Sequence, residues 1–463
     1  MEFTITETNK GKKCIIYEGY KFRVDTTLSD GSFSWRCTNG KCKARVKTDC
    51  EIGSIVPVQL QHNHENDERK LERQQLRTAV KSKASDDMTA RPAKIIRTEL
   101  CKVTENNLQS GDLKCLAQSI YRERRKQYPV LPKNREEVHQ ALESMNTTTS
   151  KGEEFVLENN PDTGIVILSC TTNLEFLVTS AEEIFIDGTF KSCPKYFYQL
   201  YSIHGLCNGH YIPLVYVLLP GKSEEIYRTM WKCLHDICVS KNLQLQPSVI
   251  HVDFEFPILT IMKETFPDAI IKCCRFHLGQ AWWRKIQNLG LSKEYKDKNS
   301  DIGQWLKLSN GLHFIDPADI EDCFIEELMS CAPQKEKCTN YADYLVDNYV
   351  TPHSKFPPVL WAEVPSNDKR TNNAAESFHA HFNAQFYKAH PTIFIFMDVV
   401  KKLQATTYLK IRSTGMPAVP KKVDKEKCEY AITQFAKYKS QDINRRQYLQ
   451  SMGCSFMART DLM

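Results

Sequence analysis

The spacing of apolar residues divides the chain into segments of different predicted structure. Residues 14–64 contain short runs of β-branched and aromatic residues separated by Gly, Asp, Ser and Asn, which predicts a small β-rich domain. Residues 65–135 are rich in strong helix formers, and Pro92 stands where a helix would begin. From about residue 163, apolar strands alternate with amphipathic helices, which predicts a layered α/β domain.

The apolar segments of this α/β region follow a defined order. Three strands come in succession, and a series of helix, strand, helix, strand and helix follows them. This order predicts a mixed sheet with helices on its faces, which is the order of the ribonuclease-H-like fold. The predicted strands cover residues 182–187, 196–206, 210–220, 248–253 and 269–274, and the predicted helices cover residues 223–243, 257–266 and 277–289.

Two of the predicted strands end in an aspartate. The apolar run before Asp187 and the run before Asp253 are both buried-strand patterns. In a ribonuclease-H-like sheet the first and fourth strands are neighbours, so the two carboxylates would face each other. Carboxylates at that range repel one another unless a cation lies between them. Because oxygen ligands favour Mg²⁺ or Mn²⁺, these strand ends are a candidate metal site.

A third acid comes from a predicted helix near residues 373–386. Asn373 and Glu376 fall on one face of this helix, while Phe378 and Phe382 mark an apolar stripe. A glutamate on a helix is usually solvated. Beside two strand-end aspartates, Glu376 becomes a candidate for the third ligand of a metal pair.

The β-rich segment contains four closely spaced metal-ligand residues, Cys37, Cys42, His62 and His64. A domain of about 60 residues buries little apolar surface and often needs a bound metal. Two thiolates and two imidazoles form a closed tetrahedral set that suits structural Zn²⁺. The C-x4-C…H-x-H spacing therefore predicts a zinc site.

Charge is unevenly distributed along the chain. The net charge is +6, but residues 69–135 carry +10 and residues 401–463 carry +8, whereas residues 136–400 carry −12. Basic segments on both sides of an acidic region indicate a polyanionic partner, with nucleic acid the favoured candidate. Solvated helices or flexible ends would have the same composition.

The overall composition narrows the class of protein. Hydrophobic residues make up 41% and charged residues 25% of the 463 residues, as in ordinary globular chains. No apolar run approaches the roughly 20 residues of a membrane span, so we expect no membrane partner. The first residues lack the apolar core of a secretion signal. The 18 cysteines therefore indicate thiols and metal ligands rather than a disulfide framework.

The β-rich segment resembles the FLYWCH-type zinc finger, a relative of the plant WRKY-type DNA-binding fold. The matching stretches are Tyr17–Phe22, Trp35–Cys37, Lys41–Arg45 and His62–His64. The resemblance implies a sheet that docks on double-stranded DNA through phosphate contacts, with a protein-binding finger as the alternative. The candidate DNA-binding residues are Arg36, Lys41, Lys43, Arg45 and Lys47.

Residues 163–390 closely resemble the MULE-type transposase domain, the catalytic region of Mutator-like DNA transposons. The matching pieces are Asp187–Phe190, Asp253–Glu255, Cys274–His277 and Asn373–Glu376. The resemblance maps the family's acidic triad onto Asp187, Asp253 and Glu376, so Asp253 is preferred over its neighbour Glu255.

Two further parts of the chain correspond to features of this family. Cys274 and His277 match its C-x-x-H element, for which metal binding, structural packing and contact with target DNA all stay open. Residues 291–370 correspond to the family's helical insertion between the second aspartate and the glutamate.

The resemblance implies a nuclear DNA transposase that cleaves transposon ends and joins them to target DNA. The three acids would hold two Mg²⁺ or Mn²⁺ for phosphoryl transfer, while Zn²⁺ would be structural. Double-stranded DNA would be the partner, and a homo-oligomer is expected because two ends are handled. The alternatives are a domesticated transposase acting as a DNA-binding, transcriptional or chromatin factor without catalysis, and a structure-specific nuclease.

The expected organisation follows these assignments. A FLYWCH-type finger is expected over residues 1–66, and a basic helical linker or DNA-binding region over 67–160. The catalytic domain is expected over 161–400, and a basic C-terminal tail over 401–463. The tail lacks the second zinc motif found in plant relatives, and its role stays open.

Overall fold

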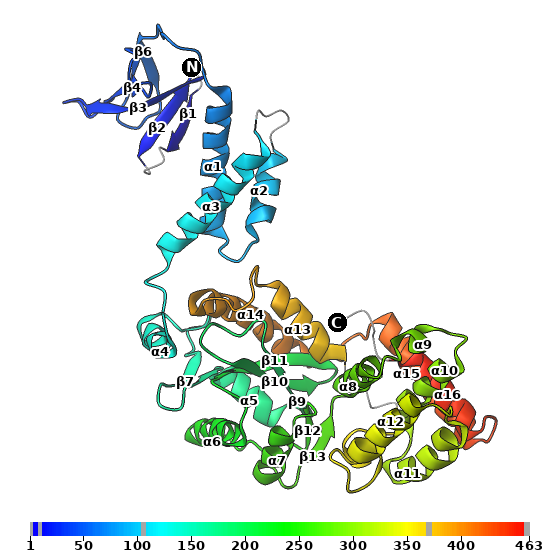
Figure 1. Ribbon diagram of the computed structural model, residues 1–463. Helices are drawn as coiled ribbons and strands as arrows, with labels where there is room; N and C mark the ends of the chain where they lie inside the picture. Colours follow the sequence, from blue (N-terminus) through cyan, green and yellow to red (C-terminus); the bar gives the residue numbers. More distant parts are fainter. Residues whose placement is uncertain (1–2, 8–11, 103–107, 367–372, 458–463) are drawn as a thin grey trace. The chain divides into compact units, whose positions relative to one another are not determined.

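The structure of the protein is a computed structural model that describes residues 3–7, 12–102, 108–366 and 373–457, with only the backbone for 373–376. The chain divides into two compact units (Figure 1). The first unit comprises Met1–Leu131 with Gln385–Tyr387, and the second comprises Pro132–Ala384 with Lys388–Met463.

The first unit begins with a six-stranded antiparallel sheet in which each strand pairs with the next along the chain. Glu18 and Gly19 both have positive φ, as the two-residue hairpin loop between β2 and β3 requires. Alternate residues point into a core around Phe22 and Trp35, which confirms the predicted β-rich domain. The strands are β1 (Thr4–Glu7), β2 (Lys13–Tyr17), β3 (Tyr20–Thr27), β4 (Phe33–Cys37), β5 (Arg45–Thr48) and β6 (Ile55–Gln59).

Three helices follow, as predicted for the basic segment. The Asp67 side chain accepts a hydrogen bond from the Lys70 backbone N–H at the start of the first helix, and Pro92 begins the second. Apolar residues from all three helices form a small core of their own. The helices are α1 (Glu68–Asp86), α2 (Pro92–Leu100) and α3 (Ser110–Gln127).

The second unit is built on a seven-stranded mixed sheet in the order β13-β12-β9-β10-β11-β8-β7. Strands β9, β10 and β11 are antiparallel neighbours, whereas β12 pairs with β9 and β13 pairs with β12 in parallel. The five predicted strands are present, and β7 and β8 extend the sheet beyond them. The strands are β7 (Val156–Asn160), β8 (Ile165–Leu168), β9 (Glu183–Thr189), β10 (Gln199–Cys207), β11 (His210–Leu219), β12 (Val249–Val252) and β13 (Ile270–Cys273).

Helices cover both faces of this sheet (Figure 1). Ile184 and Ile186 of β9 share a core with residues of α6 (Glu224–Ser240) and α7 (Phe256–Thr265). Because neighbouring side chains of a strand point to opposite faces, Asp187 points to the other face. On that face, the rings of His204 on β10 and Phe378 on α13 (Asn373–Ala384) lie 4.5 Å apart.

The remaining helices are distributed along the second unit, and several of them lie in the chain segment between α8 and α13. That segment also contains short 3-10 helices (Leu312–Phe314, Pro317–Asp319, Met329–Cys331, Pro358–Leu360) and π-helical turns (Phe324–Leu328, Val346–Val350). No helix in the described part of the chain combines the length and apolar character needed to cross a bilayer. The helices are α4 (Arg135–Ser144), α5 (Thr171–Thr179), α8 (Arg275–Asn288), α9 (Ser292–Lys296), α10 (Asp301–Gly311), α11 (Ile320–Cys323), α12 (Glu336–Leu345), α14 (Ile393–Ser413), α15 (Lys422–Lys439) and α16 (Arg445–Ser455).

The basic C-terminal segment is folded into helices that pack in the second unit. Helix α16 packs against α10, and the Tyr448 hydroxyl donates to the Phe314 carbonyl at 3.0 Å. The two helices approach so closely that Gly453 lies against the Lys307 carbonyl. The segment therefore contributes to the packing of the second unit as well as carrying charge.

This close approach predicts a large effect of one methyl group. A Cβ at position 453 would collide with the backbone of Lys307, so one of the two helices would have to move. We expect Gly453→Ala to lower the free energy of unfolding by roughly 1–3 kcal/mol, measured by thermal denaturation. Gly415→Ala is the matched control, because a Cβ there meets nothing within 4 Å. Equal melting temperatures of the two variants would contradict this packing.

Candidate metal centres and nucleic-acid surface

The four predicted zinc ligands of the N-terminal sheet converge on one point. Cys37 ends β4, Cys42 precedes β5, and His62 and His64 follow β6, and their ligand atoms all lie within 4.8 Å of one another. Each sulfur lies 3.3 Å from a histidine ring nitrogen, and the two nitrogens lie 3.4 Å apart. Zn²⁺ with bonds of about 2.0–2.3 Å gives tetrahedral edges of roughly 3.3–3.8 Å, so the four side chains fit this ion.

Neighbouring groups orient these ligands. Backbone N–H groups point at both sulfur atoms at 3.5 Å, as is usual for metal-binding thiolates. Nδ1 of His64 lies 2.8 Å from the Glu65 carbonyl, which leaves Nε2 as the ligand atom of that ring. Tyr20 stacks on His62 with ring centroids 3.5 Å apart. The cluster thus has the donor set and the supporting contacts of a structural zinc site.

The strand register places three arginines in a row across the finger sheet. Arg23 of β3 lies opposite Arg36 of β4, which in turn lies opposite Arg45 of β5. Asp25 pairs with Arg45 at 2.8 Å and offsets part of this charge. Like charges directly opposite one another in a sheet are destabilising, so the row favours an anionic partner.

The five predicted DNA-binding residues lie on and beside this row. Arg36 and Arg45 belong to it, while Lys43 and Lys47 flank Arg45 and alternate with buried residues. Lys41 is exposed in the turn between the two zinc-binding cysteines. Sequence reasoning missed Arg23, although its position directly after the apolar Phe22 of a predicted strand is a signal that could have found it.

The two strand-end aspartates of the second unit are neighbours. Strands β9 and β12 pair in parallel, and continuing their register by two residues sets Asp187 beside Asp253. Asp187 is buried and Asp253 is partly buried. Together with His277 they offer ligand atoms that all lie within 4.8 Å of one another.

Two histidines approach these carboxylates from different helices. Nδ1 of His277, at the start of α8, lies 2.7 Å from Oδ1 of Asp253. Nε2 of His379, on α13, lies 3.1 Å from Oδ2 of Asp187. Neither ring nitrogen has a hydrogen bond of good geometry within the described part of the chain. Buried nitrogens and oxygens gathered in this way suit a shared divalent cation.

Burial and neighbouring charges shift the pKa values of this site. Burial raises the pKa of Asp187, and the charge of Asp253 adds to this, so that it reaches about 7 despite the two histidines. Burial lowers the pKa of His379, and Asp187 opposes this only in part. Burial also lowers the pKa of His277, but Asp253 and Cys274 outweigh it and raise that pKa to about 12. A divalent cation would relieve the carboxylate repulsion and displace protons.

Glu376 and Cys274, the other candidate residues of this site, lie on or beside the two helices that carry the histidines. Glu376 lies in the first turn of α13, one helical turn before His379 and on the same helix face, but its side chain lies outside the described residues. Cys274 is buried immediately before α8 and precedes His277 by three positions. Sequence reasoning missed His379, although the Glu-x-x-His spacing is a signal that could have found it.

Glu255 is engaged away from the two aspartates. Its carboxylate accepts a hydrogen bond from the Tyr227 hydroxyl at 3.1 Å and lies 3.7 Å from the Lys222 ammonium. The Tyr227 hydroxyl also accepts from the Gln199 side chain at 2.9 Å. This network holds the Glu255 carboxylate through Tyr227 and Lys222.

Comparison with known families matches two segments of the chain. The family model of the FLYWCH zinc finger domain matches residues 5–64, and that of the MULE transposase domain matches residues 183–281. The second match includes Asp187, Asp253 and His277. No curated protein matches the chain. The chain is therefore a transposase-related protein that carries a FLYWCH zinc finger domain followed by a MULE transposase domain.

Proposed function

We propose that this protein is a DNA transposase of the Mutator-like type, which cleaves transposon ends and joins them to target DNA. The observation that carries the proposal is the pair of adjoining carboxylates, Asp187 and Asp253, with His277 beside them, all within the matched MULE domain. The strand order, with three antiparallel strands and two parallel ones beside the first, supports a ribonuclease-H-like core.

The acids would act through charge and position. Asp187, Asp253 and Glu376 would hold Mg²⁺ or Mn²⁺, ions that supply charge stabilisation for attacking and leaving oxygens. Water would form a new P–O bond at the transposon end while the P–O3′ bond breaks, which leaves a 3′-hydroxyl. That hydroxyl would then attack a target phosphodiester, whose own 3′-oxygen leaves. Each step exchanges one P–O bond for another, so no oxidant or reductant is required.

The finger would supply affinity for double-stranded DNA. The row of Arg23, Arg36 and Arg45 presents three guanidinium groups on adjacent strands, which suits contacts with phosphates. Zn²⁺ bound by the Cys and His ligands would hold the strand ends beneath this row. A protein that acts on chromosomal DNA in this way would work in the nucleus, and handling two ends favours a homo-oligomer.

A cleavage assay tests the proposal directly. The purified protein is incubated with Mn²⁺, a plasmid target and a donor duplex ending in the inverted repeats that flank its gene. We expect free 3′-hydroxyl ends and then donor strands joined to the plasmid. Cleavage without joining would identify a structure-specific nuclease. Binding without cleavage, or a gene without flanking repeats, would favour a domesticated DNA-binding factor instead.

The contact between His277 and Asp253 makes a separate prediction about metal affinity. We expect His277→Ala to weaken Mn²⁺ binding roughly 10–100-fold, because the ring either binds the ion or orients the carboxylate that does. Free Mn²⁺ measured by electron paramagnetic resonance, with zinc retained, gives the affinity. His235→Ala, an exposed histidine on α6, is the control. Unchanged affinity in His277→Ala would remove this histidine from the proposed site.

A further inference from the structure

One face of helix α3 carries basic and polar side chains without an exposed acid. Lys114, Gln118, Arg122 and Arg125 are all exposed and follow one another at helical spacing, and we call them the basic face of α3. The two acids of this helix are not exposed, and Asp112 is buried. Glu123 is partly buried and pairs with Lys81 and Lys126.

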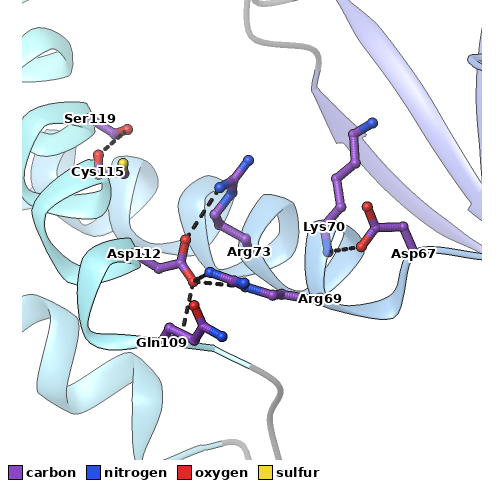
Figure 2. Close-up of polar contacts among 8 residues, drawn as sticks. All are labelled: Asp67, Arg69, Lys70, Arg73, Gln109, Asp112, Cys115 and Ser119. Carbon is purple, nitrogen blue, oxygen red and sulfur yellow. Dashed lines mark hydrogen bonds and ion pairs between the residues drawn. The ribbon is translucent and has the colours of Figure 1, made fainter.

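The start of α3 is fixed to α1 by ion pairs to a buried carboxylate. Figure 2 shows Asp112 between the two helices, with Arg69 and Arg73 reaching its carboxylate at 3.0 and 3.2 Å. The same carboxylate accepts the backbone N–H of Gln109 at 3.0 Å and so caps α3. A buried carboxylate satisfied by two guanidinium groups sets the rotation of α3 about its axis.

The other end of α3 is fixed in a similar way. Arg124 is buried and donates to the carbonyls of Asp87 and Ala90, both at 2.7 Å, where α1 passes into α2. Leu116 and Ile120 pack into the core of the three helices between these two anchors. The helix is therefore held along its length, and its basic face lies opposite the buried one.

We propose that the basic face of α3 binds double-stranded DNA, as a second contact beside the finger and independent of the metal site. Residues 69–135 carry a net charge of +10. Lys114, Arg122 and Arg125 place part of this charge on the exposed side of α3. An α-helix of about 10–12 Å diameter fits the major groove of about 12 Å width. Lys and Arg bind phosphates, and Gln118 offers an amide suited to a base edge.

Binding of the full chain to a mixed-sequence fluorescent duplex tests this proposal. Fluorescence anisotropy is measured without added divalent ion, so that no strand is cut, and over a range of salt concentrations. We expect the Lys114→Ala/Arg122→Ala double variant to bind roughly tenfold more weakly. Its slope of log affinity against log salt should be smaller by about 2, since each lost phosphate contact removes about 0.9.

A matched double variant separates this contact from general charge attraction. Lys94→Ala/Arg97→Ala removes the same charge from exposed positions on α2 of the same unit. We expect its affinity to fall less than about threefold and its salt slope to stay near that of the wild type. Equal losses in the two double variants, or no loss in the α3 variant, would overturn the proposal. So would unchanged duplex affinity combined with weaker binding of an acidic peptide, which would identify α3 as a protein-binding face.

Discussion

Replacement of Asp187 by asparagine is expected to abolish Mn²⁺-dependent cleavage while DNA binding is retained. Asp187 is buried beside Asp253. The amide of an asparagine at this position would keep the shape of the site but could not hold a cation there. Loss of one such electrostatic contribution costs roughly 10²–10³ in rate or more. The rate of 3′-hydroxyl end formation, compared with duplex affinity in the same preparation, measures the effect. Glu376→Gln is expected to behave in the same way.

The thermal stability of the Asp187→Asn variant distinguishes loss of the metal site from damage to the fold. Because Asp187 and Asp253 repel one another when no cation is present, Asp187→Asn should be at least as stable as the wild type in metal-free buffer. Added Mn²⁺ should raise the melting temperature of the wild type but not of the variant. Glu255→Gln is the matched control, since Tyr227 and Lys222 hold that acid elsewhere, and it should cleave normally. Normal cleavage by Asp187→Asn would remove the proposed mechanism.

Replacement of Cys42 by serine is expected to unfold the finger. Structural zinc contributes roughly 10–16 kcal/mol of apparent binding free energy, far more than the few kcal/mol that the core of so small a domain supplies. Loss of one ligand breaks the closed set of Cys37, Cys42, His62 and His64. We expect zinc content to fall by one ion, the β-sheet amide signals of the finger to collapse in NMR spectra, and duplex affinity to drop.

Cys50→Ser is the matched control for this prediction, because Cys50 is exposed and lies outside the ligand cluster. Its zinc content and spectra should equal those of the wild type. A chelator strong enough to remove zinc should reproduce the Cys42→Ser spectra in the wild-type protein. Full zinc content and an intact sheet in Cys42→Ser would show that these residues do not form the site.

Local sequence patterns predicted much of the fold and many residues of both candidate metal sites. The alternation of β-branched residues and turns in the finger, together with four ligands close along the chain, predicted a zinc-bearing sheet, because neighbouring strands bring such residues together with little freedom. The order of elements in the α/β region suggested a ribonuclease-H-like sheet, and in such a sheet the strands that end at Asp187 and Asp253 are neighbours.

Only the tertiary structure decided which side chains approach these positions from other elements. His277 and His379 reach the aspartates because α8 and α13 pack at particular rotations against the sheet. The spacing within α13 places His379 on the face of Glu376, but it does not set how far that face lies from Asp187. The arginine row of the finger depends on the register of three strands, which a shift of one residue would abolish. Sequence patterns encode geometry along a segment, whereas the relative placement of segments comes from the packing of many distant side chains at once.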